Sequence, residues 1–256
     1  PFVSSMGIPL LLGGHGHELV NDRIGSTTIL EAGSYMRYYG KVEINFNTEL
    51  DSVITIESGI YDNLDTAPPD PAVEAVVSYW RTMTDNELSQ VIGYADQTID
   101  QRSDLMFNMV TDSWLWAIPS ADISLTNRGG IRQYIPSGDI TLSTIVGVLP
   151  FDNDIVELDL TGSQLINSIG YLVVGGMTTV GEYRLSDGTP IFQDSVYQVL
   201  TTDYLYSITD YPFQEYDPVP YNTSISYRQP VIDWIKSMNT SQSNPLNPYL
   251  DPVSRQ

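Results

Sequence analysis

Strand-like and helix-like segments alternate over residues 122–201, and this alternation constrains the fold more than any other feature of the sequence. Hydrophobic residues at positions 156, 158 and 160 are separated by acidic ones, which is the two-residue period of a strand with one buried face. Thr161 and Gln164 then have the spacing of a capping box, so a helix should follow through about Leu172. Residues 195–201 favour a further strand. The sequence therefore predicts a mixed α/β fold.

Two more helices are predicted before this region. Asp70 is a favourable N-cap residue, and Pro71 occupies the first helical position after it. A second helix should run roughly over residues 103–116. The stretch 62–70 contains consecutive prolines and is a candidate linker. The first helix carries apolar residues on one face, at Val73, Val76, Val77, Trp80 and Met83.

The first sixty residues favour strands. Residues 8–12 are apolar on both faces and predict a short buried strand, and the alternation over 42–46 predicts a half-exposed one. We therefore expect an α/β piece over 1–57, a linker and helix over 58–92, and a domain over 93–256. The chain opens at Pro1 without a methionine or a signal peptide, which indicates one part of a longer protein.

The charge balance excludes a class of partners. The chain has 11 Lys and Arg residues against 32 Asp and Glu residues, a formal net charge of −21. A protein that binds a nucleic-acid duplex needs a basic face, so we expect no such partner. A small anionic substrate remains compatible, since a few arginines in a cleft set the local field.

Composition also bears on the cellular setting. The chain has no cysteine, which excludes disulfides and thiolate metal sites. Its longest apolar run, residues 8–12, is far shorter than the roughly 20 residues that a membrane helix needs, so we expect no transmembrane segment. An acidic, lysine-poor composition favours an extracellular, periplasmic or cell-surface location. Asn222 and Asn239 begin glycosylation sequons, which would make a glycoprotein of a chain secreted in a eukaryote.

Both histidines lie in the segment Gly13-Gly14-His15-Gly16-His17, directly after the predicted strand at 8–12. Residues two apart in extended backbone point to the same side, so two imidazoles at this spacing can face one metal ion or two neighbouring ones. Glycines allow close approach of the backbone, and the carboxyl ends of strands are where α/β proteins place their sites. The alternative is a surface loop that contains two histidines without binding a metal.

Residues 127–132 combine two arginines, an amide and two glycines. Arginine offers a planar fork to phosphate or carboxylate, and glycines expose backbone N–H groups, so this segment is a candidate anion pocket. A tight turn with solvated arginines is the alternative. Phe151 follows a proline and is either a pocket wall or a core residue. Residues 204–213 are rich in aromatics and offer a stacking surface, a hydroxyl acceptor or a wet surface loop.

Taken together, these segments resemble the C-terminal domain of the 5′-nucleotidases. That family has an Asn-Gly-Gly-Gly-Ile-Arg block, a Leu-Pro-Phe-Gly-Asn block and a Leu-Thr-Gly-x-x-Leu block in the order in which residues 127–132, 149–153 and 160–165 occur here. The segment 14–17 is similar to the last metal motif of the metallophosphoesterase domain that precedes this domain in the family. The resemblance implies the terminal part of a metallophosphoesterase β-sandwich, followed by an α/β substrate-recognition domain.

The resemblance assigns roles to individual residues. It implies that His15 and His17 are ligands in a centre of two divalent metal ions, of which zinc or manganese would suit histidine ligation. Such a centre activates water and holds the transferring phosphoryl oxygens. The substrate would be a nucleotide or another small phosphate ester. The implied substrate residues are Arg102, Asn127, Arg132, Phe151, Asp210 and, as the second aromatic that sandwiches the base, Phe213.

Some family features are altered or lie outside this sequence. The family's Gly-Gly-Asp reads Ile208-Thr209-Asp210 here, and Arg128 stands where glycine is usual. The family's earlier metal motifs do not occur in these 256 residues, so a missing N-terminal metallophosphoesterase segment is the expected partner. We therefore expect the C-terminal portion of a phosphomonoesterase. The alternatives are a non-catalytic binding or structural protein with the same fold, and a phosphoesterase that acts on cyclic nucleotides or dinucleotides.

Overall fold

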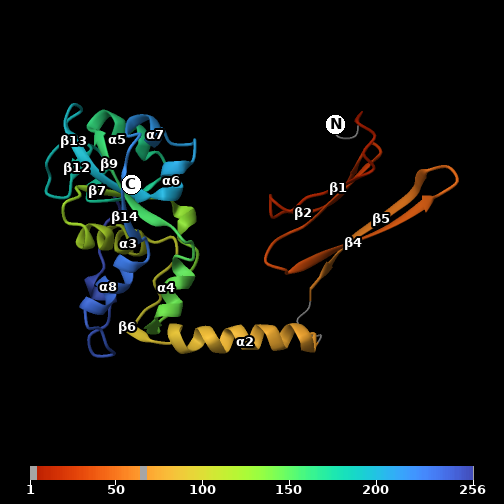
Figure 1. Cartoon of the computed structure of the whole chain (residues 1–256), viewed down its shortest axis with the longest axis horizontal. Helices are drawn as coiled ribbons and strands as arrows, with labels where there is room; N and C mark the ends of the chain where they lie inside the picture. Colours follow the sequence, from red (N-terminus) through yellow and green to blue (C-terminus); the bar gives the residue numbers. More distant parts are fainter. Residues whose placement is uncertain (1–4, 64–67, 256) are drawn as a thin grey trace. The chain divides into compact units, whose positions relative to one another are not determined.

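The computed structural model of the chain describes residues 5–63 and 68–255. The chain divides into two compact units, unit 1 (residues 1–76) and unit 2 (residues 77–256), and the boundary falls within helix α2 (Pro71–Leu88). The elements form a mixed α/β fold, as predicted (Figure 1). The expected domain limits at residues 57 and 92 stay predictions.

A five-stranded sheet forms the centre of unit 2. Its strand order is β10-β7-β13-β9-β14, in which β7 and β13 are parallel and the other pairs are antiparallel. The mixed directions bring the starts and ends of different strands to one edge of the sheet. The strands are β7 (Ile123–Thr126), β9 (Asp154–Thr161), β10 (Val173–Gly175), β13 (Val196–Thr202) and β14 (Tyr221–Ser226).

Helices cover both faces of this sheet (Figure 1). On one side α3 (Asp104–Ala117) packs against β7, β10 and α8 (Gln229–Ser237), with α4 (Leu142–Val148) and the pair β6 (Val91–Ala95) and β8 (Gly138–Thr141) nearby. On the other side lie α5 (Gly162–Ile169), α6 (Asp203–Ser207) and α7 (Phe213–Tyr216). The pair β11 (Met177–Thr178) and β12 (Arg184–Leu185) completes the unit.

Two hydrophobic clusters fill the space between sheet and helices, and strand periodicity separates them. In β9, Ile155 belongs to the cluster under α3 and α8, whereas Leu158 and Leu160 belong to the cluster under α5.

The predicted starts of helices α3 and α5 are both confirmed. Ser103 caps α3 by accepting from the Met106 N–H group, and Thr161 with Gln164 forms a reciprocal capping box.

The tail from residue 241 has no strand or α-helix among its described residues, only a β-bridge between Ser241 and Asn244 and a 3₁₀ turn over Asn247–Tyr249. It is nevertheless held to α3. The Arg255 guanidinium pairs with the Asp112 carboxylate, with N–O distances of 2.6 and 2.8 Å. The Asn108 amide donates to the carbonyl groups of Asp251 and Val253.

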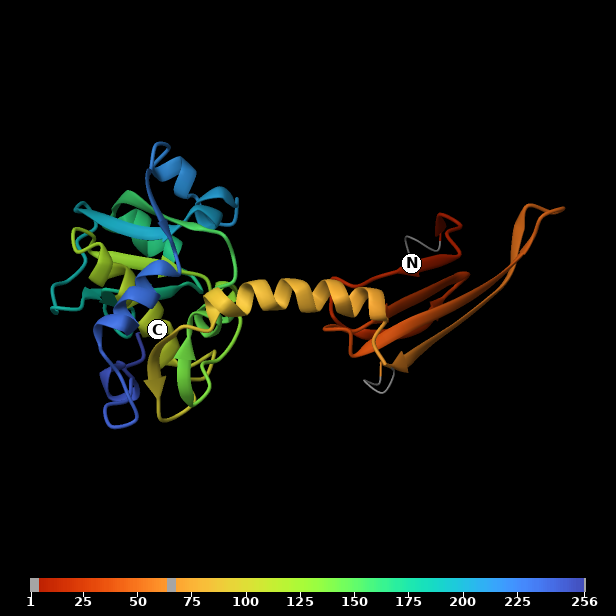
Figure 2. The ribbon, with the colours of Figure 1, turned by 60° about the horizontal axis from the view of Figure 1, so that its bottom comes forward.

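Unit 1 consists of strands. Three of them, β1 (Leu10–Leu12), β2 (Leu19–Ile24) and β3 (Thr27–Ala32), form a sheet in the order β1-β3-β2. The strands β4 (Tyr38–Asn47) and β5 (Ser52–Asp62) form a long antiparallel ribbon, visible in Figure 2.

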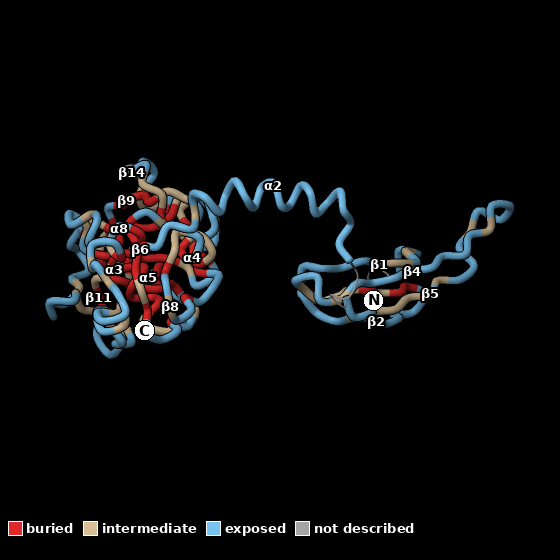
Figure 3. Tube along the Cα trace, turned by 90° about the horizontal axis from the view of Figure 1, so that it is seen from below, coloured by how far each residue is buried: buried red, intermediate tan, exposed pale blue. Residues whose placement is uncertain are grey.

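The prediction that residues 8–12 are buried is wrong. Leu11 and Leu12 lie on opposite faces of β1 and are both exposed, because no described part of unit 1 covers either side chain. Figure 3 shows in colour that buried residues are concentrated in unit 2 and that α2 is exposed.

Asp70 caps α2 as predicted, by accepting from the Ala72 and Val73 N–H groups. No helix among residues 5–63 and 68–255 is long and apolar enough to cross a membrane.

Candidate functional site: a pocket at one edge of the unit 2 sheet

The directions of three strands bring three loops together. β7 ends at Thr126, directly before Asn127, and β13 ends at Thr202, two residues before Tyr204. These strands are parallel, so both residues lie at the same edge of the sheet. β9 is antiparallel to β13 and begins at Asp154, so the turn just before it reaches that edge as well. Sheet topology therefore gathers residues that lie far apart in the sequence.

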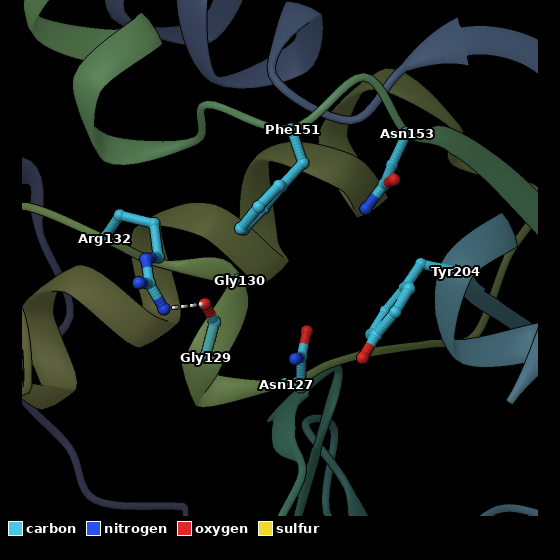
Figure 4. A pocket seen from close by; sticks show the side chains of 7 residues that line it. All are labelled: Asn127, Gly129, Gly130, Arg132, Phe151, Asn153 and Tyr204. Atoms are coloured by element: carbon cyan, nitrogen blue, oxygen red, sulfur yellow. Dashed lines mark hydrogen bonds between the residues drawn. The ribbon is translucent and has the colours of Figure 1, made fainter. Parts of the chain in front are cut away.

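A cavity of about 300 Å³ opens where the three loops meet. Its volume is at the lower end of the range for small-ligand sites. The Phe151 ring and the Asn153 amide point into this space, and Tyr204 faces it from α6 (Figure 4). Phe151 and Tyr204 keep 43% and 48% of their surface exposed, so both rings are available to a ligand. The lining residues are Asn127, Gly129, Gly130, Arg132, Phe151, Asn153 and Tyr204.

The loop over residues 127–132 is held in one shape. A 3₁₀ turn spans Arg128–Gly130, and the Arg132 guanidinium donates to the Gly129 carbonyl group at 3.3 Å. A side chain at position 130 would bring its Cβ within 2.9 Å of the Asn127 Oδ1 atom, so glycine is needed there to seat the amide. The turn thus places an amide and a guanidinium on the same cavity.

The two arginines of this loop have different surroundings. The Arg132 Cζ atom lies 5.9 Å from the centre of the Phe151 ring, and in Figure 4 Arg132 and Tyr204 lie on opposite sides of that ring. The Arg128 guanidinium instead stacks over Phe107 of α3, at 5.2 Å, and does not line the cavity. A cation over an aromatic face is electrostatically favourable in both places.

The structure does not place Phe213 in this cavity, so its prediction as the second stacking aromatic is wrong. Phe213 is fully buried in the cluster under α5, α6 and α7, and its ring stacks on Tyr211 with centres 5.5 Å apart. A ring with no accessible face cannot stack on a ligand. Tyr204, at the other end of the same aromatic segment, faces the cavity instead.

Comparisons with known proteins show what the chain is similar to. The family model described as 5′-nucleotidase, C-terminal domain, matches residues 83–171. The trifunctional nucleotide phosphoesterase YfkN of Bacillus subtilis is 31% identical over 180 residues, which are 62% of this chain and 12% of the relative. Human 5′-nucleotidase is 27% identical over 187 residues, 65% of this chain and 32% of the relative.

These findings support the predicted resemblance to the 5′-nucleotidase family, whose C-terminal domain matches residues 83–171. The fold of the chain is similar to that of the 5′-nucleotidase precursor of Thermus thermophilus, with a TM-score of 0.71 at 20% identity over 97% of this chain and 59% of that structure. The matched residues span about an eighth of the length of YfkN and about a third of the length of human 5′-nucleotidase.

The segment of the present chain that contains both histidines lies in unit 1. His15 and His17 are exposed, and the His17 ring contacts Tyr35 edge-on with centres 6.2 Å apart. The loop bends over the Glu31 carboxylate, which accepts from the Glu18 N–H group at 3.3 Å and lies 3.0 Å from the position of a Cβ at residue 13. A side chain at residue 13 would therefore require the Glu31 carboxylate to shift slightly.

The described residues do not complete a metal site. Within residues 5–63 and 68–255, no group of three or more His, Asp or Glu side chains is placed to hold a metal ion. His15 and His17 are both exposed, but residues 15 and 16 form a turn and His17 has a φ of 58°, so the extended backbone assumed for the pair is not present. Their role as metal ligands stays a prediction.

Arg102 and Asp210 are exposed and do not line the cavity. The Arg102 N–H group donates to the Asp100 side chain just before α3. Sequence analysis missed two lining residues, Asn153 and Tyr204. Both positions follow from the strand directions, because Tyr204 comes just after β13, which is parallel to β7, and Asn153 comes just before β9, which is antiparallel to β13.

Proposed function

We propose that this chain is the C-terminal portion of a metal-dependent phosphoesterase that hydrolyses nucleotide phosphate monoesters, and that unit 2 holds the nucleotide. The observation that carries the proposal is the cavity bordered by the Phe151 and Tyr204 rings, with an arginine fork and two amides on the same space. Flat apolar walls with a few polar groups suit a nucleobase.

The lining residues suggest a division of labour. Phe151 and Tyr204 would sandwich the base, and the Asn127 and Asn153 amides would bond to its polar edge, since an amide both donates and accepts. Arg132 would bind the ribose or the phosphate through its fork. Arg102 and Asp210 stay proposed substrate residues that approach the ligand from outside the present lining.

His15 and His17 would supply two imidazole ligands to the metal centre. The metal ions, zinc or manganese, would activate the attacking water and neutralise charge on the phosphoryl oxygens. The remaining ligands would come from a metallophosphoesterase segment upstream of Pro1. An extracellular or cell-surface setting is part of the proposal, supported by the 22% identity of the chain to the cell wall protein Lmo0130 of Listeria monocytogenes over 244 residues.

A second candidate is a binding protein without catalysis. The observation that favours it is that the described residues bring only two potential metal ligands together at the histidine loop. The segment 208–210, which differs from the family's glycine-rich sequence, points the same way.

Binding measurements test the pocket. We expect the chain to bind a nucleoside monophosphate at least tenfold more tightly than ribose 5-phosphate, because stacking contributes about 1–3 kcal/mol per base. Equal affinity for the two ligands would contradict a base-binding cavity.

Phosphate release separates the two candidates. We expect the protein at its full encoded length to release phosphate from nucleotides with zinc or manganese, and to lose that activity on His15→Ala or His17→Ala. Nucleotide binding without release, under every metal tried, would favour the non-catalytic alternative.

A further inference from the structure

Phe151, the aromatic wall of the cavity, is held by two residues that follow it by 76 and 77 positions. Its N–H group donates to the Tyr227 hydroxyl at 3.0 Å, and its carbonyl group accepts from the Arg228 guanidinium. The Tyr227 N–H group donates to the Asn153 carbonyl group, also at 3.0 Å. Both backbone polar groups of Phe151 and one of Asn153 are therefore bonded to the same dipeptide.

The Tyr227 hydroxyl is itself fixed by the core. Tyr227 is 1% exposed, and its carbonyl group accepts from the Trp114 indole nitrogen at 2.8 Å. The two rings meet edge-on with centres 6.5 Å apart, and Trp114 is fully buried in α3. Phe151 is thus connected to α3 through the contacts of buried Tyr227 and Trp114.

Arg228 stands at a helix position that normally serves another purpose. It is the N-cap residue of α8, where Ser, Thr, Asp or Asn would bond to the first turn, and its side chain makes no capping bond. Its guanidinium instead reaches Phe151 and lies 6.0 Å from the centre of the Tyr227 ring. Its Nε atom is buried without a hydrogen-bond partner, which carries a desolvation cost. Departures from local rules of this kind mark functional positions.

We propose that Tyr227 and Arg228 are positioning residues of the nucleotide pocket, which fix Phe151 and Asn153 in their binding geometry before the ligand arrives. This inference rests on the proposed function. Holding the wall in place in the free protein reduces the ordering that binding must impose, and so strengthens affinity. Neither residue lines the cavity, so each acts through Phe151 and Asn153.

The protonation state of Tyr227 fits this role. Burial raises its pKa, against smaller opposing effects of the Phe151 N–H group and Arg228. The hydroxyl therefore stays neutral at physiological pH and accepts the Phe151 hydrogen bond as an uncharged group.

The chain offers a matched control for Tyr227. The Tyr197 hydroxyl accepts a 2.9 Å bond from the Phe192 N–H group, and Tyr197 is 7% exposed in the other hydrophobic cluster. Phe192 does not line the cavity. Tyr227→Phe and Tyr197→Phe therefore remove the same kind of bond, one at the pocket wall and one away from it.

The experiment compares these variants, with Arg228→Lys, in the complete 256-residue chain. The affinities for adenosine and adenosine 5′-monophosphate are measured, with amide hydrogen exchange over residues 149–153. We expect Tyr227→Phe to weaken both ligands by the same factor, about three- to tenfold for one lost hydrogen bond, and to speed exchange at Phe151. Arg228→Lys loses the fork and should act in the same direction. Tyr197→Phe should leave affinity and this exchange unchanged.

Each other outcome has a distinct meaning. Unchanged affinity in both Tyr227→Phe and Arg228→Lys, with only a lower melting temperature, would overturn the positioning role and leave the pocket intact. A loss for the nucleotide alone would show that these residues act on the phosphate, and would also overturn it. If the unmodified chain binds neither ligand, the proposed function fails and this role fails with it.

Discussion

Unit 1 and unit 2 have similar hydrophobic patterns but very different burial. In unit 2, Met106, Val110 and Trp114 of α3 are completely buried. Among the described residues of unit 1, Leu30 is the one buried hydrophobic side chain, whereas Leu12 keeps 63% of its surface exposed. An apolar pattern therefore marks side chains that favour burial. Whether they are buried depends on the other helices and strands that pack against them.

The comparison also separates two halves of the proposed chemistry. Unit 2 gathers the candidate substrate residues Asn127, Arg132 and Phe151 around one cavity by its own sheet topology. Unit 1 presents two histidines and no third ligand among its described residues. Under the proposed function, recognition would be complete within unit 2, whereas the metal centre would need further ligands.

Hydrogen exchange should show the largest difference between the units. We expect amides in β9 and β13 to exchange about a thousandfold or more slowly than those in β1 and β4, because buried elements open only with the free energy of global unfolding. Mass spectrometry of peptides from the complete chain measures this directly. Comparable protection in both units would mean that unit 1 is stable without further cover.

Two phenylalanines in unit 2 sharpen the distinction between core and pocket. Phe213→Ala should lower the free energy of unfolding by about 3–5 kcal/mol, since it empties a buried site. Phe151→Ala should cost little stability and weaken nucleotide binding by about 1–3 kcal/mol, the range for base stacking. Denaturant titration and equilibrium binding on both variants test this. A reversal of the two effects would exchange their roles and contradict the pocket.

The two arginines of residues 127–132 give a smaller contrast. Arg132→Lys keeps the charge but loses the fork, so nucleotide affinity should fall by about 1–2 kcal/mol. Arg128→Lys is the control, because Arg128 stacks on Phe107 outside the cavity. Similar losses at both positions would indicate a diffuse basic patch.

The smallest expected effect concerns acid stability of the tail. Burial raises the pKa of Asp251, but the Val253 N–H group and Arg255 outweigh it and hold the pKa below its usual 3.8. A lowered pKa in the folded state means stabilisation that is present above pH 3.8 and is lost as pH falls through the folded value. Asp251→Asn should remove this pH dependence. The change in the free energy of unfolding should be less than about 1 kcal/mol, because the ion pair is partly exposed. Unfolding curves at pH 7 and pH 3 that shift equally in both proteins would contradict the assignment.

Local signals predicted much of unit 2 because they act within a few residues. The Thr161 and Gln164 capping box forms as expected, and α3 begins where the helix over residues 103–116 was predicted. Asn127 and Arg132 flank one short turn, Arg128–Gly130, so their proximity was also readable from the sequence.

Contacts between distant segments set the rest. Whether Tyr204 or Phe213 meets the cavity depends on where β13 ends and how α7 packs, which no local pattern reports. The bonds from Tyr227 and Arg228 to Phe151 cross more than 70 residues. The exposure of β1 depends on elements outside its own segment, so its apolar run predicted burial wrongly.

Calorimetric titration of the complete chain with a nucleoside monophosphate, once in a chelator and once in zinc or manganese, tests most directly whether recognition is complete within unit 2. The account predicts saturable binding with the same dissociation constant in both conditions, and weaker binding in both on Phe151→Ala. Binding that requires the metal, or no binding in either condition, would contradict it.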